Sequence, residues 1–323
     1  MPDTQPAPAR TGLNGEGHLT DSWYLAAPSA RLKAGKQERL MILGEPVVLG
    51  RTPAGEAFAL RDICPHRLVP LSAGAQIETD GEWTLQCPYH GWRFGTDGGC
   101  RLMPSLTEDS AQASARVSVR RYPLHEAGGA VWLYVAHDPR STAPPAVPPP
   151  EFGPLPDRPG FAAETLLDAA MDEAVTALTQ DDIPFAPIDR GWSTERHARP
   201  LAGAFLRQAL GSKAQTETFF QLPGDRWEIV TGETARLVTL SALTPEAPDK
   251  TRLTRLMWWT GAPLLRFAAP RLARTALAQT AERARAPGNT GAWLALKQEW
   301  TAARTEGRAF VNPVTPRTPN GSR

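Results

Sequence analysis

The sequence predicts an α+β chain of two domains, a small antiparallel β domain followed by a sheet with long helices beside it. Two observations lead to this fold class. Short apolar runs alternate with turn residues over residues 18–137, whereas residues 161–311 combine extended segments with helical ones. The segment between them, residues 138–160, contains nine prolines. Because proline cannot donate a backbone hydrogen bond, these residues predict a stiff linker and place the domain boundary there.

The first domain is expected to consist of short strands joined by tight turns. Turn residues occur at 44–46 and 53–55, and residues 75–86 have the pattern of a hairpin. The apolar run 130–136 is typical of a buried strand. Residues 1–17 and 312–323, in contrast, predict a disordered arm and a flexible tail.

The second domain is expected to begin with a helix. Residues 164–180 place apolar side chains on one helical face, namely Leu167, Ala170, Met171, Ala174, Val175 and Leu178. Strands are predicted at 216–222, 226–231, 235–243 and 253–260, and helices at 263–285 and 291–306. The helix over 263–285 is amphipathic. Such a helix can lie on a membrane surface, but we expect its apolar face to pack on the sheet.

Composition narrows the classes of partner and compartment. The chain has 35 basic and 34 acidic residues, a balance that gives no compositional reason to expect a nucleic-acid or anionic-membrane partner. Its three cysteines are too few for a disulfide scaffold. Neither a secretory signal nor an apolar run of membrane-spanning length is visible in the sequence. We therefore expect a cytoplasmic protein with no membrane association.

Two cysteine–histidine pairs lie close together in the first domain. Cys64 and His66 form one C-x-H pair, and Cys87 and His90 form a C-x-x-H pair. Two thiolates and two imidazoles suit a sulfide-bridged pair of irons, with the thiolates on one iron and the imidazoles on the other. The imidazoles raise the reduction potential of such a cluster. A Cys2His2 zinc site is the competing interpretation, although zinc sites usually pair cysteine with cysteine and histidine with histidine. Cys100 lies beyond both pairs and is expected to be a packed thiol.

These pairs resemble the signature of Rieske iron–sulfur proteins. The segments CPHR and CPYHGWRF are similar to the ring-hydroxylating oxygenase branch, and the resemblance extends through SWYLAAPS, ALRDICPHR and EGRAFVNPV. It therefore covers nearly the whole chain. It implies a Rieske [2Fe–2S] domain followed by a helix-grip domain. By this resemblance the ligands are Cys64 and Cys87 on the ferric iron and His66 and His90 on the iron that changes valence, with Arg67 and Trp92 beside the cluster.

The same resemblance implies a second, mononuclear iron in the helix-grip domain, held by two histidines and a carboxylate. The family motif D-x-x-H-x-x-x-x-H aligns with this chain through the Pro-Phe of residues 184–185. Thr179 then stands at the bridging aspartate, Asp182 and Pro187 stand at the two histidines, and Gly288 stands near the third ligand. None of these four residues supplies the expected chemistry, so the sequence predicts a degenerate iron site.

Other residues offer no obvious replacement for these ligands. The remaining histidines are His18, His125, His137 and His197, of which His197 alone lies in the second domain, on an expected strand edge. Asp181, Asp182 and Glu173 add carboxylates near the predicted helix. We expect the two aspartates to be solvated charges at a helix end, although a carboxylate there opposes the helix dipole.

The hypothesis that follows is an electron-transfer subunit. By the family resemblance, oxygenase subunits assemble as trimers in which each cluster serves the mononuclear iron of its neighbour, and His90 would face that neighbour. This chain would take electrons from an NAD(P)H-linked flavin reductase or a ferredoxin, since it has no nucleotide-binding glycine fingerprint. It would then pass them to an iron-bearing partner subunit, and it would not be catalytic alone.

Two alternatives remain open. The chain is a complete Rieske monooxygenase or demethylase with non-standard iron ligands, or it is a redox-sensing module that binds an apolar ligand. The first predicts a third iron in each chain and substrate-dependent oxygen consumption. The second predicts ligand affinity that changes with the oxidation state of the cluster. The sequence does not identify a substrate.

Overall fold

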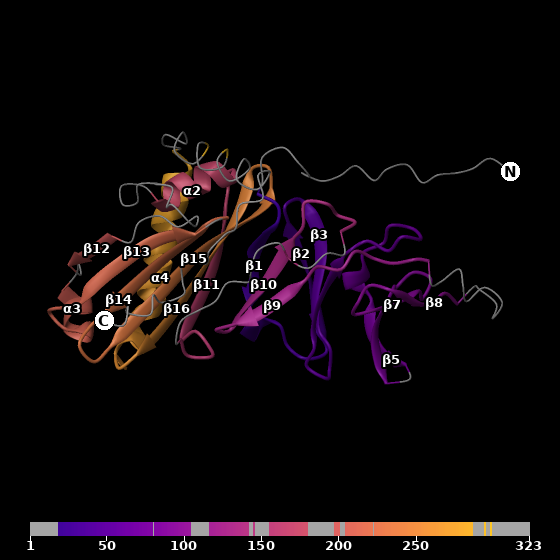
Figure 1. Cartoon of the computed structure of the whole chain (residues 1–323), viewed down its shortest axis with the longest axis horizontal. Coiled ribbons are helices and arrows are strands. Elements are labelled where there is room, and N and C mark those ends of the chain that lie inside the picture. Colours follow the sequence, from indigo (N-terminus) through magenta and orange to yellow (C-terminus); the bar gives the residue numbers. More distant parts are fainter. Residues whose placement is uncertain are drawn as a thin grey trace, which may run out of the picture.

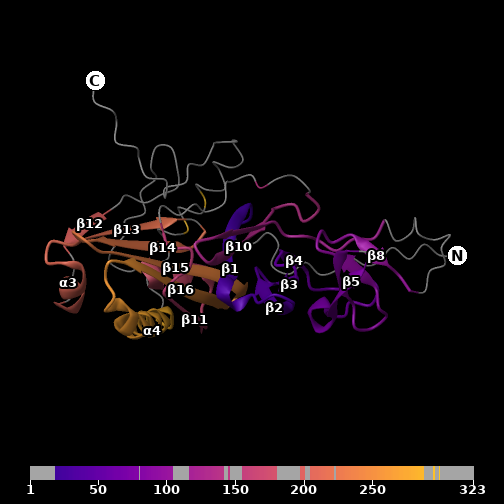
Figure 2. The same ribbon diagram turned by 90° about the horizontal axis from the view of Figure 1, so that it is seen from below.

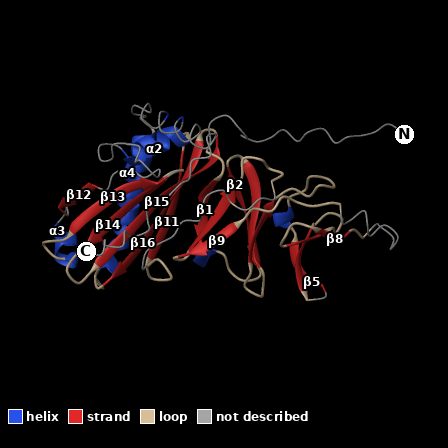
Figure 3. Cartoon of the chain, viewed as in Figure 1, coloured by secondary structure: helices blue, strands red, loops and turns tan. Residues whose placement is uncertain are grey.

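The computed structural model describes residues 19–79, 81–104, 116–141, 145, 155–179, 197–200, 204–221, 223–286, 294 and 298. Strands predominate in this part of the chain (Figure 3), and they form four antiparallel sheets. The three smaller sheets come from the first half of the chain and the large sheet from the second half, and the two halves lie side by side along the long axis of the molecule (Figure 1). The predicted α+β class is confirmed.

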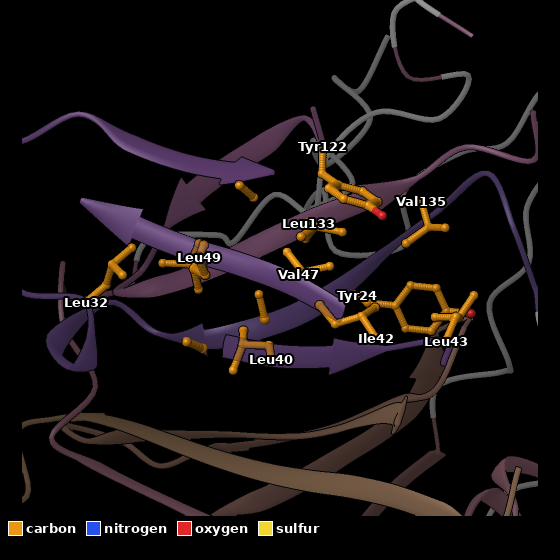
Figure 4. Packing of buried hydrophobic residues seen from close by; sticks show 14 residues of the cluster. Tyr24, Leu32, Leu40, Ile42, Leu43, Val47, Leu49, Tyr122, Leu133 and Val135 are labelled. Carbon is orange, nitrogen blue, oxygen red and sulfur yellow. The ribbon is translucent and has the colours of Figure 1, made fainter. Parts of the chain in front are cut away.

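Two three-stranded sheets enclose the core of the first half. One has the order β1-β10-β9 and the other β2-β3-β4. Their bounds are Ser22–Pro28 (β1), Ala130–Val135 (β10), Leu124–Ala127 (β9), Lys36–Ile42 (β2), Glu45–Arg51 (β3) and Ala57–Arg61 (β4). Fully buried aliphatic and aromatic side chains, among them Tyr24, Val47, Leu49 and Leu133, fill the space between the sheets (Figure 4). The predicted strand at 130–136 is confirmed as β10.

The third sheet adjoins the two cysteine–histidine loops, since one loop precedes its first strand and the other joins its second and third strands. Its four strands run in sequence order, with the bounds Ala75–Thr79 (β5), Glu82–Gln86 (β6), Arg93–Gly95 (β7) and Cys100–Leu102 (β8). Strands β5 and β6 form the predicted hairpin. Its turn includes Gly81 at φ 81°, a left-handed conformation that glycine adopts without steric cost. A short 3-10 helix, η2 (Leu71–Ala73), follows the first loop, and another, η1 (Ser29–Arg31), follows β1.

The second half is a six-stranded sheet with helices on one face. The strand order is β11-β16-β15-β14-β13-β12, with the bounds Phe161–Leu167, Lys250–Thr260, Arg236–Ala247, Asp225–Thr231, Gln215–Gln221 and His197–Pro200 in that order. The helices are α2 (Met171–Thr179), α3 (Ala204–Leu210) and α4 (Leu265–Ala284). Figure 2 shows α4 lying along one side of the sheet. In the described part of the chain, no helix is long and apolar enough to cross a membrane.

Most of the predicted elements of this half are confirmed. The four predicted strands correspond to β13, β14, β15 and β16, and the helix over 263–285 corresponds to α4. The apolar side chains of α4 pack in the protein core, as expected, and those of Leu265, Ala269 and Ala273 join a cluster with the sheet residues Leu237 and Met257. The helix predicted over 291–306 falls almost entirely outside the described residues.

The prediction of one helix over residues 164–180 was wrong in its first part. Residues Phe161–Leu167 form strand β11, paired with β16 from Phe161↔Met257 to Leu167↔Thr251. The helix starts at Met171, where the Glu173 carboxylate accepts a hydrogen bond from the Ala170 N–H at 2.9 Å. Tertiary pairing with a long central strand therefore prevails over the local helical pattern, which cannot register a non-local partner.

The opposite face of the large sheet packs directly on the first half of the molecule. Trp23 and Trp132, from β1 and β10, share an apolar cluster with Trp227 and Trp258, from β14 and β16. The Trp258 indole N–H donates to the Gly128 carbonyl oxygen at 2.8 Å. This interface fixes the first half against one face of the sheet and leaves the other face to the helices.

Candidate metal centre

The first cysteine loop begins directly after β4 and has a closed backbone. The Cys64 N–H donates to the Val69 carbonyl oxygen at 2.9 Å, and the Leu68 N–H donates to the Cys64 carbonyl oxygen at 2.8 Å. Leu68 has φ 60°, a conformation that non-glycine residues adopt at a cost. The result is a tight loop that holds the Cys64 thiol inside and turns its tip toward solvent.

The second cysteine loop, between β6 and β7, repeats the same backbone pattern. The Cys87 N–H donates to the Trp92 carbonyl oxygen at 2.8 Å, and the Gly91 N–H donates to the Cys87 carbonyl oxygen at 3.2 Å. Gly91 has φ 69° and stands four residues after its cysteine, as Leu68 does in the first loop. The two loops are therefore structural equivalents, although their histidines stand at different spacings.

A side-chain contact closes the base of each loop. The Asp62 carboxylate is 1% exposed and accepts hydrogen bonds from the Ser72 N–H at 2.6 Å and from the Ser72 hydroxyl at 2.7 Å. In the second loop, the Arg93 Nε–H donates to the Gln86 side-chain oxygen at 2.9 Å. These contacts join the residues before and after each loop, and they hold the two ends of each loop together.

The four predicted ligands lie in two layers. Cys64 and Cys87 are buried in an apolar cluster, at 2% and 3% exposure, and their thiols interact directly. His66 and His90 are exposed, and their ring centroids are 4.6 Å apart. The structure thus brings together the four residues that the spacing predicted, with sulfur donors inside and nitrogen donors at the surface.

The electrostatics of the thiols depend on burial and on nearby amides. Burial raises the pKa of Cys64 to about 11, the neighbouring Cys87 thiol also raises it, and the backbone N–H groups of His66 and Arg67 lower it. Thiolate is the form that binds iron, so a bound cation would have to stabilise the charge. Backbone N–H groups aimed at a cluster sulfur also influence reduction potential. Arg67 therefore lowers the pKa of Cys64 through its backbone N–H, which the sequence could not indicate.

The Trp92 ring lies beside the His66 ring. It stacks on the His66 ring with a centroid separation of 4.7 Å and an interplanar angle of 1°. The pKa of His66 is lowered by loss of hydration, then by the charges of His90 and Arg67. Neutral imidazole is the metal-binding form, so these neighbours favour ligation, and the indole fixes the orientation of the ring.

This donor set fits a binuclear cluster. Each iron of a sulfide-bridged pair takes two protein ligands, and two thiols below two imidazoles supply that arrangement. No group of three or more His, Cys, Asp or Glu side chains that could hold a single metal ion occurs among the described residues. Cys100 is 7% exposed and hydrogen-bonds to the Leu102 carbonyl oxygen at 3.6 Å, which confirms a packed thiol.

Of the four positions at the expected mononuclear iron, the structure describes Thr179. This residue ends α2, is 6% exposed, and its hydroxyl donates to the Val175 carbonyl oxygen at 2.8 Å. Asp181, Asp182, Pro187, Gly288 and His18 lie outside the described residues. Glu173, considered as a spare carboxylate, instead accepts a hydrogen bond at the start of α2.

The other described histidines lie outside the cysteine–histidine loops. The His125 ring lies edge-on to Trp23, with centroids 6.2 Å apart, and His137 Nδ1 is 3.0 Å from the Thr20 hydroxyl. His197 is the first residue of β12, which is an edge strand of the large sheet, as its sequence predicted.

Comparison with known protein families identifies the first half of the chain. Residues 22–123 match the family model of the Rieske [2Fe-2S] domain. The chain is 41% identical over 121 residues to the oxygenase subunit of 3-chlorobenzoate-3,4-dioxygenase from Comamonas testosteroni, an alignment covering 37% of this chain and 27% of that protein. It is 38% identical over 135 residues to the oxygenase component of dicamba O-demethylase from Stenotrophomonas maltophilia, covering 42% and 37% of the two chains.

A plant relative extends the alignment further along the chain. Chlorophyllide a oxygenase from Arabidopsis thaliana is 30% identical over 184 residues, covering 54% of this chain and 31% of that protein. The chain thus spans about a third of the length of each of these relatives.

Solved structures extend the likeness to the second half. The crystal structure of dicamba monooxygenase bound to dicamba superposes with a TM-score of 0.63 at 22% identity, covering 94% of this chain and 93% of that one. The Pseudomonas putida CBB5 protein NdmB gives a TM-score of 0.62 at 15% identity, covering 88% and 92%. At such identities the likeness concerns the fold, and it includes the helix-covered sheet as well as the first half.

Proposed function

Since this chain has the [2Fe–2S] domain and the fold of the Rieske non-heme iron oxygenases, we propose that it is the electron-delivering subunit of a heteromeric oxygenase. The observation that carries this proposal is the state of Thr179. Its hydroxyl is engaged with its own helix, at the position where the resemblance places a bridging carboxylate. A hydroxyl so placed supplies neither a negative charge nor a carboxylate acceptor. The cysteine–histidine site, in contrast, has its full donor set.

Cys64, Cys87, His66 and His90 would hold the cluster, which supplies a one-electron carrier when bound. The buried thiols exclude water from the inner side, at 2% and 3% exposure. The histidines are exposed, so they form the edge through which an electron reaches a docked protein. The reducing equivalents would come from a flavin reductase or a ferredoxin, and the acceptor would be a mononuclear iron in a partner subunit.

Co-purification tests this function. The tagged chain is isolated from its native host, and associated chains are identified by mass spectrometry. We expect a partner that carries D-x-x-H-x-x-x-x-H, and we expect oxygen consumption from the pair together with a reductase but not from this chain and the reductase. If the chain purified as a homo-oligomer that turned over substrate, the proposal would be wrong.

A complete monooxygenase is the second candidate. It is favoured by the likeness to dicamba monooxygenase, which covers 94% of this chain and includes the second half. This reading requires iron ligands other than the four positions named above. The same co-purification experiment separates the two candidates, because a complete enzyme needs no iron-bearing partner.

A further inference from the structure

The two ligand loops of the candidate metal centre are fastened at their bases by different kinds of contact. At the base of the second loop, the Arg93 Nε–H donates to the Gln86 side-chain oxygen, and both residues are partly exposed. At the base of the first loop, the contact is made by the carboxylate of Asp62, whose side chain is 0% exposed. Burial of a carboxylate is costly, so a buried one two residues before Cys64 calls for a physical reason.

The buried carboxylate fastens the segment that leaves the first loop. Its two oxygens accept hydrogen bonds from the Ser72 N–H at 2.6 Å and from the Ser72 hydroxyl at 2.7 Å. Ser72 lies in the 3-10 helix η2, whose first residue, Leu71, is fully buried in the same apolar cluster as Cys64 and Cys87. Hydrogen bonds to a charged acceptor are stronger than neutral ones, so this contact fixes η2 beside the thiols.

Strand β2 contacts the same region through two alternate residues. The Arg39 guanidinium, in a side chain 49% exposed, lies 3.7 Å from the Asp62 carboxylate. The Gln37 side-chain N–H donates to the Gly74 carbonyl oxygen at 2.8 Å. Residues two apart on a strand point to the same face. One face of β2 therefore contacts both Asp62 and the residue that follows η2.

Gly74 is the point where the first loop meets the second. A Cβ atom on Gly74 would lie 1.9 Å from the Gln86 carbonyl oxygen, far inside van der Waals contact, so the two backbones approach as closely as a glycine allows. Gln86 directly precedes Cys87, and its pairing with Ala75 begins the β5–β6 hairpin. A displacement of η2 and Gly74 would therefore also displace the start of the second loop.

We propose that Asp62 is a positioning residue for both ligand loops. By holding Ser72 it fixes η2 and the Gly74 contact, and thereby the separation of the Cys64 and Cys87 thiols. Its negative charge also opposes the addition of an electron to a cluster bound there, since net charge near a cluster influences its potential. This role rests on the cluster assignment of the proposed function but not on a partner subunit.

The test compares the cluster-loaded parent protein with three variants. Asp62→Ala should lose its cluster to an iron chelator about tenfold faster or more, followed by visible absorbance, because two hydrogen bonds to a charge are removed. Asp62→Asn keeps the side-chain shape without the charge and should raise the reduction potential in protein-film voltammetry. Ser72→Ala removes one hydrogen bond but keeps the charge, so it should speed cluster loss about threefold and leave the potential nearly unchanged.

Two matched controls separate positioning from general stability. Glu45 is also buried in the first half, at 7% exposure, and its carboxylate accepts hydrogen bonds from Arg120 and Tyr122. Glu45→Gln should lower the thermal midpoint but, well below that midpoint, leave the rate of cluster loss and the potential as in the parent. Gln86→Ala removes the neutral contact of the second loop and should speed cluster loss less than Asp62→Ala does.

Cluster loss in Asp62→Ala no faster than in Glu45→Gln would overturn this role. If Asp62→Ala takes up no cluster, Ser72→Ala decides, and a rate of cluster loss equal to that of the parent in this variant contradicts the proposal. A parent protein that binds no cluster would instead contradict the cluster assignment itself, and this role with it, so the two failures are distinguishable.

Discussion

Both halves of this molecule share the fold of the same solved structure, but they differ in the side chains that stand at their two expected metal sites. In the first half, two loops with equivalent backbones hold two buried thiols below two exposed imidazoles. In the second half, the end of α2 presents the hydroxyl of Thr179, which bonds back to Val175. Packing patterns determine a fold, whereas a few side chains determine a site, so one can change while the other stays.

The largest expected effect is the loss of iron when a ligand cysteine of the first half is replaced. Cys87→Ser should abolish cluster binding, because it removes a thiolate from a ferric iron. Cys100→Ser is the matched control, since Cys100 is also buried but bonds to a backbone carbonyl oxygen. Iron content and visible absorbance of the purified variants measure the difference. Loss of the cluster in Cys100→Ser alone would contradict the ligand assignment.

The histidine layer should be sensitive in a different way. His90→Cys replaces an imidazole with a thiolate and should shift the reduction potential toward the value of about −400 mV typical of all-cysteine clusters. Protein-film voltammetry measures the shift, and electron transfer to the proposed partner subunit should stall. His125→Gln, a histidine beside Trp23 and away from the loops, should leave the potential unchanged. An unaltered potential in His90→Cys would show that His90 is not a ligand.

A buried acid in the second half gives a pH-dependent effect. Burial raises the pKa of Asp225, which is 2% exposed, well above its ordinary value. A raised folded-state pKa makes a contribution to stability that is fully present below the unfolded value of about 3.9 and is lost as pH rises toward the folded value. Asp225→Asn should therefore flatten the fall in thermal midpoint above about pH 4 and raise the midpoint at neutral pH by several degrees.

The control for this prediction is Asp168→Asn. Asp168 is exposed, and its hydrogen bond with Lys250 lowers its pKa. Its contribution to stability is therefore present above the unfolded-state pKa and is lost as pH falls. This variant should not raise the midpoint at neutral pH. A pH profile of Asp225→Asn identical to that of the parent would show that Asp225 does not titrate in this way.

The smallest expected effect concerns the two loops themselves. Leu68 adopts a left-handed conformation at 68% exposure, where the second loop has Gly91. Relief of backbone strain and loss of chain stiffness nearly cancel, so Leu68→Gly should raise the thermal midpoint by about 2 °C or less. Gly91→Ala should lower the free energy of unfolding by about 1 kcal/mol. Equal and large destabilisation by both changes would contradict the equivalence of the loops.

The features of the fold and of the candidate site that the sequence predicts are those that depend on residues close together in the chain. The spacing of Cys64, His66, Cys87 and His90 predicted two loops whose cysteines and histidines do lie together. The extended segments of the second half predicted four strands that correspond to β13, β14, β15 and β16. Strand β11 was missed because Leu167 also fits a helical pattern with the residues after it. The choice between strand and helix depends on pairing with β16, about ninety residues away.

Features that depend on register or on backbone atoms had no sequence signal. The stack of Trp92 on His66 and the Asp62–Ser72 contact arise only once the loops close. Likewise, Arg226, Ser241 and Arg255 look like ordinary alternating polar residues in three separate strands. They become neighbours on one face of the sheet because β14, β15 and β16 pair in that register.

The central claim, a complete cluster site beside a missing mononuclear site, is tested most directly by iron content. The chain is purified alone, incubated anaerobically with excess ferrous iron, desalted, and analysed for iron alongside the EPR spectrum of the dithionite-reduced sample. The account predicts two irons per chain and a Rieske signal, with no further iron retained. A third iron, together with substrate-dependent oxygen consumption by this chain and a reductase, would contradict it.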